Sequence, residues 1–219
     1  MIEDFMGVKE RREREKETRR NQILDAARTL LFSHGIEKVS ISRISKEAEL
    51  GVGTIYFYYK NKEEIFIALQ QEGVDVLFSR IAPIAVQDVE PDEKLRQVAQ
   101  AYYEFTETHR EYFNIINYFL SSPKIFFVED LKQKIDMSGT KILAVIQDIV
   151  TGGNQSGIFM EKEPQKFSIM FWGTIHGLVQ FKKLEHTTLE NETHKEVFDY
   201  SVEKMVQGLF GTCRQKETE

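Results

Sequence analysis

The sequence predicts an all-α protein, and three observations favour this class. The 219 residues include only four prolines and 13 glycines, which leaves room for long helices and few tight turns. Hydrophobic residues make up 41% of the chain and charged residues 29%, as in an ordinary folded domain with a sizeable core. Apolar residues also recur at helical spacing. In the first long segment they are Ile23, Ala26, Ala27, Leu30 and Leu31.

The composition argues against several classes of protein. No apolar run reaches the ~18–20 residues that a membrane span needs, so we expect no membrane partner. The charged N-terminus has no apolar signal-peptide segment behind it, which makes the cytoplasm the expected location. Cys213 is the one cysteine, and the five histidines show no metal-ligand spacing. We therefore expect no disulfide, metal or cofactor.

Capping residues and breakers place the first helices. Residues 1–8 are expected to be frayed, and a helix is expected from about Lys9 to His34, where Gly35 ends it. Ser40 is a good N-cap for a short second helix. After a turn at residues 49–51, a third short helix is expected over about 52–58.

A fourth helix follows this short one. Asn61 caps it, and Glu64, three residues later, completes a capping-box pattern. The helix is expected to end near Pro83. Further helical patterns, separated by breakers that include Gly152-Gly153, run over about 92–109, 111–120, 127–151, 164–185 and 193–210.

Charge is distributed unevenly along the chain. The formal net charge is −6, yet residues 1–62 hold 13 Lys/Arg against 10 Asp/Glu, which leaves the rest strongly acidic. The segment Lys9 to Arg20 is denser, with seven basic and four acidic residues. One interpretation is a solvated helix with pairs such as Glu10–Arg14 and Glu15–Arg19. The other is an arm that contacts a DNA backbone.

The second and third short helices, joined by a tight turn, predict a helix-turn-helix. Ser45 is small enough for the two helices to cross closely, and Ile55 is the apolar anchor that the third helix turns inward. The outward face starts with Val52-Gly53-Thr54, and Tyr56 and Tyr58 add hydroxyls. Lys62, at the start of the fourth helix, adds a full charge to a helix N-terminus that suits phosphate.

These residues resemble the TetR family of bacterial transcriptional regulators. The resemblance covers about residues 20–66 and rests on Ile23-Leu24-x-Ala26-Ala27, Phe32, Gly35, Ser40, Ile44, Ala48 and the run Gly53 to Glu63. It implies an N-terminal DNA-binding domain over 1–62 and a C-terminal effector-binding and dimerisation domain over 63–219, with 63–83 as the connecting helix. It also implies a homodimer that binds double-stranded operator DNA.

The family's DNA contacts fall on nine positions of this chain. They are Ser42, Arg43, Val52, Gly53, Thr54, Tyr56, Phe57, Tyr58 and Lys62. The alternative is that the tyrosines only pack and Lys62 is a solvated cap, and Phe57 and Tyr59 are expected to pack at least in part. Two positions depart from the family: Glu49 stands where glycine is usual in the turn, and Gly51 stands where a serine N-cap is common. A left-handed Glu49 costs roughly 1–2 kcal/mol.

The C-terminal half is rich in aromatic residues, which fill a helical core or line a cavity for an apolar or amphipathic effector. The candidates for such a cavity are Tyr102, Phe105, Tyr118, Trp172 and His176. Acyl chains with their thioesters are one effector class, and aromatic or cationic drugs are another. The sequence does not choose between them.

The last two helical patterns are expected to form the dimer surface as a four-helix interface. Gly173 and Gly177 lie four residues apart and would let another helix approach closely. The full candidate set is Phe167, Phe171, Gly173, Gly177, Leu178, Phe198, Val202, Met205 and Leu209. The alternative is that both helices bury these residues within one chain.

The sequence therefore predicts a ligand-responsive transcriptional regulator, expected to be a repressor that its effector releases from DNA. The main alternative is a DNA-binding regulator whose C-terminal domain only dimerises or binds a protein. An enzyme is not expected, because no nucleophile–base pair or carboxylate pair stands on an apolar face. Neither the operator sequence nor the sign of regulation follows from the sequence.

Overall fold

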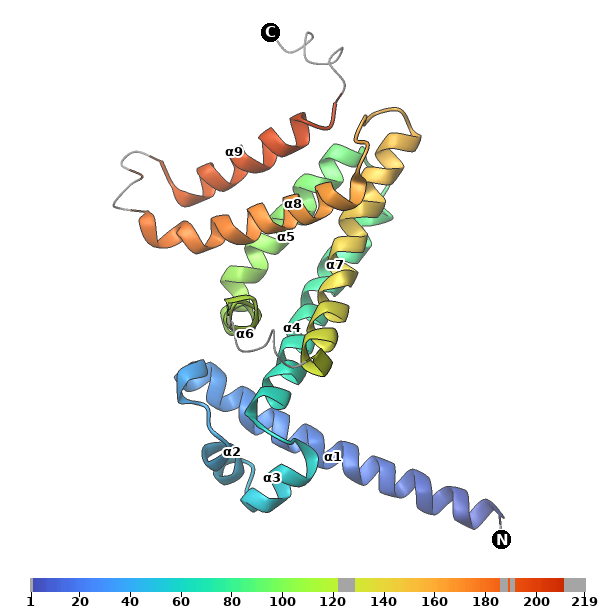
Figure 1. Ribbon diagram of the computed structural model, residues 1–219, viewed down its shortest axis with the longest axis vertical. Coiled ribbons are helices and arrows are strands. Elements are labelled where there is room, and N and C mark those ends of the chain that lie inside the picture. Colours follow the sequence, from blue (N-terminus) through green and yellow to red (C-terminus); the bar gives the residue numbers. More distant parts are fainter. Residues whose placement is uncertain (1, 122–128, 186–188, 190–191, 211–219) are drawn as a thin grey trace. The chain divides into compact units, whose positions relative to one another are not determined.

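The computed structural model in Figure 1 describes residues 2–121, 129–185, 189 and 192–210. Side chains are described from residue 7 onward within these ranges, except at 129–138 and 183–184. All regular elements of the described chain are helices, so the predicted all-α class is confirmed. None of these helices is both long and apolar enough for a membrane span. Cys213 lies outside the described residues.

The chain forms two compact units. The first comprises Met1–Gly73 and Glu111–Ile135, and the second comprises Val74–Arg110 and Asp136–Glu219. Packing thus groups the start of the fourth helix, and a later helix, with the N-terminal segment. A functional boundary near residue 62 stays a prediction.

The first unit begins with α1 (Ile2–His34), followed by the short 3-10 helix η1 (Ile36–Lys38), α2 (Ile41–Glu47) and α3 (Val52–Tyr58). The start of α4 (Lys62–Ala85) and most of α6 (Arg110–Ser121) complete it. The expectation that residues 1–8 are frayed is wrong for residues 2–8, which are helical. A helix already anchored further along extends at little cost where no proline interrupts it.

Local signals in the first unit act as expected. Ser40 caps α2 by accepting the Arg43 amide, 3.3 Å from its hydroxyl oxygen. The Asn61 side chain caps α4 by accepting the Glu64 amide at 2.9 Å. The Glu64 carboxylate accepts the Lys60 amide at 2.8 Å, one residue earlier than in the standard capping box.

The core of the first unit brings together helices that are far apart in the sequence. The predicted stripe of α1 is buried against residues of α2, α3 and α4. Ile115 and Phe119, both from α6, belong to the same cluster. A helix that follows α5 in the chain therefore supplies part of the core beneath the helix-turn-helix.

The second unit contains α5 (Pro91–Thr108), most of α7 (Glu129–Gln155), α8 (Pro164–Gln180), η3 (Phe181–Leu184) and α9 (His194–Gln207). Within it, α5, α8 and α9 pack against one another. Figure 1 shows α8 and α9 lying side by side over part of their length.

The expected break at Gly152-Gly153 is wrong, because α7 continues through both glycines to Gln155. The chain turns instead at Gly157, which has a φ of +74°. Gly153 has a packing role: a Cβ there would lie 2.2 Å from Cδ2 of Phe159. The glycine therefore marks a close approach of two segments and not a helix end.

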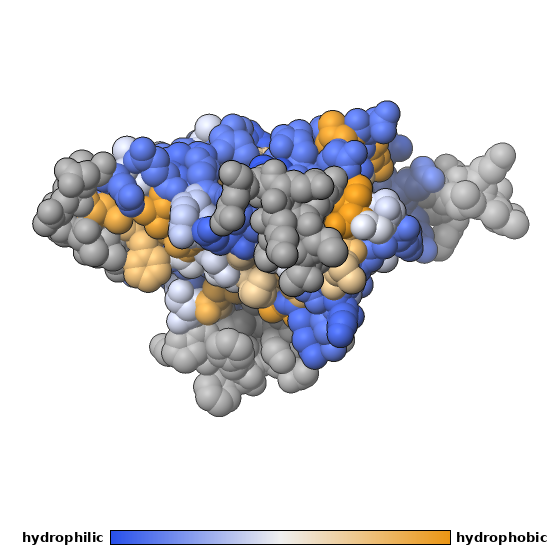
Figure 2. Space-filling model, turned by 90° about the horizontal axis from the view of Figure 1, so that it is seen from above, coloured by the Kyte–Doolittle hydropathy of each residue, from blue (hydrophilic) through white to orange (hydrophobic). Residues whose placement is uncertain are grey.

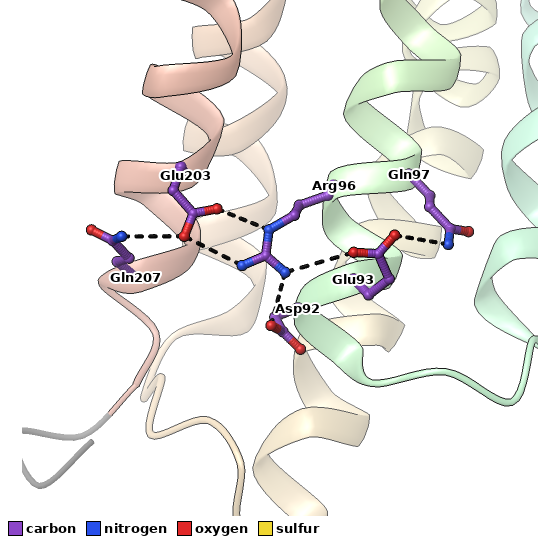
Figure 3. A network of polar contacts seen from close by, with 6 residues as sticks. All are labelled: Asp92, Glu93, Arg96, Gln97, Glu203 and Gln207. Carbon is purple, nitrogen blue, oxygen red and sulfur yellow. Dashed lines mark hydrogen bonds and ion pairs between the residues drawn. The ribbon is translucent and has the colours of Figure 1, made fainter. Parts of the chain in front are cut away.

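An ion-pair network joins α5 to α9 in the second unit (Figure 3). The Arg96 guanidinium donates to Glu203 at 2.8 and 3.3 Å, and to Asp92 at 2.8 Å. Its hydrogen bonds hold the pKa of Glu203 below the ordinary glutamate value. The charges fix α9 on α5 at the edge of the apolar core.

Candidate nucleic-acid interface

The α2–turn–α3 segment has the packing that a helix-turn-helix requires. Ser45 of α2 is buried, and its hydroxyl donates to the Ser42 carbonyl at 3.0 Å. Ile55 is fully buried in the core of the first unit. The inward anchor is confirmed, and Ser45 is buried as a crossing residue would be.

The turn contains the strain that its sequence predicts. Glu49 has a φ of +53°, in the left-handed region that favours glycine. The turn is nevertheless closed by the Leu50 amide, which donates to the Ser45 carbonyl at 2.9 Å. Gly51 takes the N-cap position of α3 and provides no side-chain cap. The substitution of glutamate for glycine is thus accommodated without loss of the turn.

The face of α3 that points away from the core is open to solvent. Tyr56 is 53% exposed and Phe57 is 75% exposed, while Val52 and Gly53 are also exposed. Thr54 and Tyr58 are half-buried. Phe57 packs only in small part, because α3 turns this ring outward with only the edge of the Tyr58 ring against it, at 5.1 Å between centroids.

Tyr59 behaves in the opposite way. Its ring is buried, as expected, and lies below the Arg20 guanidinium at 5.5 Å from the ring centroid. Burial also raises the pKa of its phenol. Within one short run the chain therefore separates rings that build the core from rings that face solvent.

The remaining predicted DNA contacts flank α3. Ser42 and Arg43 are exposed near the start of α2, where the Arg43 guanidinium donates to the Lys38 carbonyl at 3.2 Å. Lys62 opens α4, with its ammonium 5.1 Å from the Phe66 ring centroid. The structure thus brings all nine positions into one unit, on the exposed or half-buried parts of three helices.

Sequence reasoning missed a polar cluster in the same unit. Arg28 of α1 pairs with Glu72 of α4 at 2.9 Å, and the Tyr112 hydroxyl of α6 donates to the same carboxylate at 3.1 Å. Burial, followed by the charge of Glu72, raises the pKa of Tyr112. A Cβ on Gly73 would lie 2.8 Å from Cβ of Tyr112. The only signal in the sequence is the glycine itself, which permits the close approach of α6 to α4.

The effector candidates are only partly brought together. In the second unit the Tyr102 hydroxyl lies 2.6 Å from Nδ1 of His176, and its ring is 4.6 Å from that of Trp172. Burial lowers the pKa of His176 and raises that of Tyr102. Phe105 is buried and stacks on His109 at 5.4 Å. Tyr118 belongs to the first unit, where it packs edge-on against Phe66.

The dimer candidates are divided by burial. Phe167, Phe171, Phe198, Val202 and Leu209 are buried within the single chain. The stripes that predicted them are the faces by which α8 and α9 pack inside the second unit, so these side chains have no free surface for a second copy. Gly173 is exposed, and Gly177, Leu178 and Met205 are half-buried.

Other apolar side chains reach the surface near these positions. On α8 and just beyond it they are Ile169, Met170 and Phe181, each about half exposed, and on α9 it is Tyr200. Figure 2 shows apolar residues surfacing in several places among hydrophilic ones on the face it draws.

The packing and the exposed α3 face define a helix-turn-helix DNA-binding protein. Comparison with known proteins agrees. Residues 23–69 match the model for bacterial regulatory proteins of the tetR family, and residues 95–205 match that for the tetracyclin repressor-like C-terminal domain. The chain belongs to the TetR family and is a DNA-binding transcriptional regulator.

Two matches from Bacillus subtilis, one by sequence and one by structure, illustrate the relationship. The fatty acid metabolism regulator protein is 28% identical over 163 residues, which cover 74% of this chain and 82% of the relative. The crystal structure of the transcriptional regulator FadR in complex with stearoyl-CoA is 26% identical, with a TM-score of 0.68, and the match covers 85% of this chain and 97% of that one.

A third match extends the structural comparison. The fatty acid degradation regulator FadR of Bacillus halodurans is 23% identical, with a TM-score of 0.64, over 90% of this chain and 96% of that one. This likeness shows the fold. The two Bacillus subtilis matches are named as regulators, in agreement with the expectation of a regulator over an enzyme.

Proposed function

We propose that this protein is a cytoplasmic repressor that binds a palindromic operator as a homodimer and leaves it when an acyl-coenzyme A thioester binds the second unit. The observation that carries the DNA-binding part is the outward face of α3. Two aromatic side chains, Tyr56 and Phe57, are held in solvent beside the capped start of α4. Exposed rings at this position gain apolar contact only when a partner covers them.

The nine predicted positions divide by chemistry. Thr54 and Tyr56 would reach base edges or adjacent phosphates, and Val52 and Phe57 would offer apolar contact, for instance to a thymine methyl group. Arg43, Tyr58 and Lys62 suit the phosphate backbone, together with Ser42 and the backbone at Gly53. Each contact to phosphate fixes register on the duplex, whereas contacts to bases select the sequence.

The proposed effector class rests on the relatives. The Bacillus subtilis FadR structure contains stearoyl-CoA, and the curated relative of that organism is a fatty acid metabolism regulator. In this chain the Tyr102 hydroxyl and His176, which lie within hydrogen-bond distance beside Trp172, provide one polar group among aromatic rings. A thioester carbonyl that accepted a hydrogen bond from the Tyr102 hydroxyl, in place of His176, would be oriented by that bond.

The test is operator binding with and without the acyl thioester. DNA bound by the purified protein is selected from fragments of its source genome, and its affinity is measured by fluorescence anisotropy. Stearoyl-CoA is expected to weaken binding at least tenfold, whereas coenzyme A alone and free stearate leave it unchanged. Unchanged DNA affinity with stearoyl-CoA bound would contradict release by this effector. It would favour a regulator whose C-terminal domain only dimerises or binds a protein.

A further inference from the structure

The N-terminal half of α1 is a helix without a buried face. Every residue from Gly7 to Asn21 is exposed, whereas the following part of α1 buries a full apolar stripe. Helices in proteins owe most of their stability to a packed face. This segment, the α1 arm (residues 7–21), therefore has its whole surface available to a binding partner.

Basic residues collect on one side of the α1 arm. Lys9, Arg12, Lys16 and Arg20 follow one another at intervals of three or four residues and share a side of the helix. Arg11 and Arg14 lie on the opposite side by the same geometry. The arm carries seven basic and four acidic residues, in a chain whose net charge is −6.

Few of these charges are neutralised within the chain. The expected pairs Glu10–Arg14 and Glu15–Arg19 do not form. Arg19 donates instead to Gln22 at 2.8 Å, and Lys16 pairs with Glu13 at 3.1 Å. Among the described residues, Arg12 and Arg20 have no ion pair. Most positive charges on the basic side are therefore available to an anionic partner.

A groove of about 680 Å³ separates the arm from α3 and α4, all within the first unit. Lys16 and Arg20 line it from α1, and Tyr58 lines it from the end of α3. The ring of Tyr59 holds the Arg20 guanidinium at 5.5 Å. Because Tyr58 also belongs to the proposed DNA-contacting set, the groove continues that surface along the arm. Glu13, Glu17 and Glu64 line it as well.

We propose that the basic side of the α1 arm binds phosphates of duplex DNA that flanks the half-site read by α3. The proposal rests on the proposed function, because α3 must first place the arm on a duplex. At 1.5 Å per residue the arm spans roughly 22 Å, enough to pass several phosphates. Opposite charge, and continuity with Tyr58, favour DNA over a second protein as the partner.

The test compares two matched pairs of substitutions, Lys16→Gln with Arg20→Gln and, as control, Arg11→Gln with Arg14→Gln. Each pair removes two positive charges and keeps good helix formers. The probe is a fluorescein-labelled duplex that the protein selects from random-sequence DNA, made with and without about ten flanking base pairs. Affinity is measured as a function of salt, and circular dichroism checks helix content.

On the long duplex, loss of Lys16 and Arg20 removes four charges from the bound homodimer, two in each protomer. It is expected to reduce the slope of log affinity against log salt by about 4 and to weaken low-salt binding at least tenfold. The control pair and the short duplex are expected to show much smaller changes. Equal effects of both pairs, or no dependence on duplex length, would overturn the proposal while leaving operator binding intact.

Two further outcomes have distinct meanings. If the Lys16 and Arg20 variant alters the sedimenting mass but not the salt slope, the groove contacts protein and the proposal is wrong. If the unmodified protein binds no duplex even at low salt, the proposed function fails, and the proposal for the arm fails with it.

Discussion

Aromatic residues occur in two regions of this molecule and meet opposite environments. On α3, Tyr56 and Phe57 are more than half exposed, whereas Tyr102 and Phe171 in the second unit are almost completely buried. The same side-chain chemistry therefore builds a core in one place and an open surface in the other. The comparison shows that exposure, and not aromatic content, marks the candidate interface.

The strongest test of this contrast is the same substitution made in both regions. Phe171→Ala, in the core of the second unit, is expected to lower the free energy of unfolding by about 3–5 kcal/mol. Phe57→Ala is expected to change it by no more than about 0.5 kcal/mol, because its ring is 75% exposed. Denaturant unfolding measures both. A large loss for Phe57→Ala would place that ring in a core.

Two glycines of the DNA-binding unit show the same contrast between packed and open positions. Gly73→Val is expected to destabilise the protein by about 1–3 kcal/mol, because the added Cβ would lie 2.8 Å from Cβ of Tyr112. Thermal unfolding of this variant is compared with Gly53→Ala on the open α3 face, where nothing lies within 4 Å of the added Cβ. Similar losses at both glycines would contradict the close packing of α6 on α4.

The turn before α3 offers a smaller effect of opposite sign. Glu49→Gly removes a left-handed glutamate and is expected to stabilise the protein by up to about 1 kcal/mol. It also removes a carboxylate beside the proposed DNA surface, so operator affinity should rise modestly at low salt. Glu47→Gln, which removes a nearby exposed charge without changing the turn, serves as the control. A less stable Glu49→Gly variant would be inconsistent with the strain.

The smallest effect concerns the buried cluster of the second unit. Burial lowers the pKa of His176, so the unfolded state binds its proton more readily than the folded state. Stability from this group is present above the unfolded-state pKa and is lost as pH falls below it. Subtracting the pH profile of His176→Gln from that of the unmodified protein, between pH 8 and pH 5, should show this loss. If the unmodified protein instead gained stability relative to His176→Gln as the pH fell, the pKa of His176 would be raised by folding and not lowered.

Much of the first unit could be predicted because its signals are local. The stripe from Ile23 to Leu31, the Ser40 cap and the span of α3 all depend on residues a few positions apart. The exposed Phe57 and the buried Tyr59 could not be told apart, because their neighbours along the chain do not reveal which side of so short a helix is covered.

Features that depend on distant contacts could not be predicted. The Arg28–Glu72–Tyr112 cluster joins three helices, and its members are 40 or more residues apart. Similarly, the stripes of α8 and α9 are apolar whether they face another helix of the same chain or a second copy. Periodicity identified those faces but not their partners, and the dimer surface stays a prediction.

The central claim is that the open face of α3 is the surface that binds DNA. The most direct measurement is the affinity of a Tyr56→Ala, Phe57→Ala variant for a duplex selected by the unmodified protein. The account predicts a loss of at least a hundredfold with an unchanged unfolding temperature. Retention of full affinity by the folded variant would contradict it.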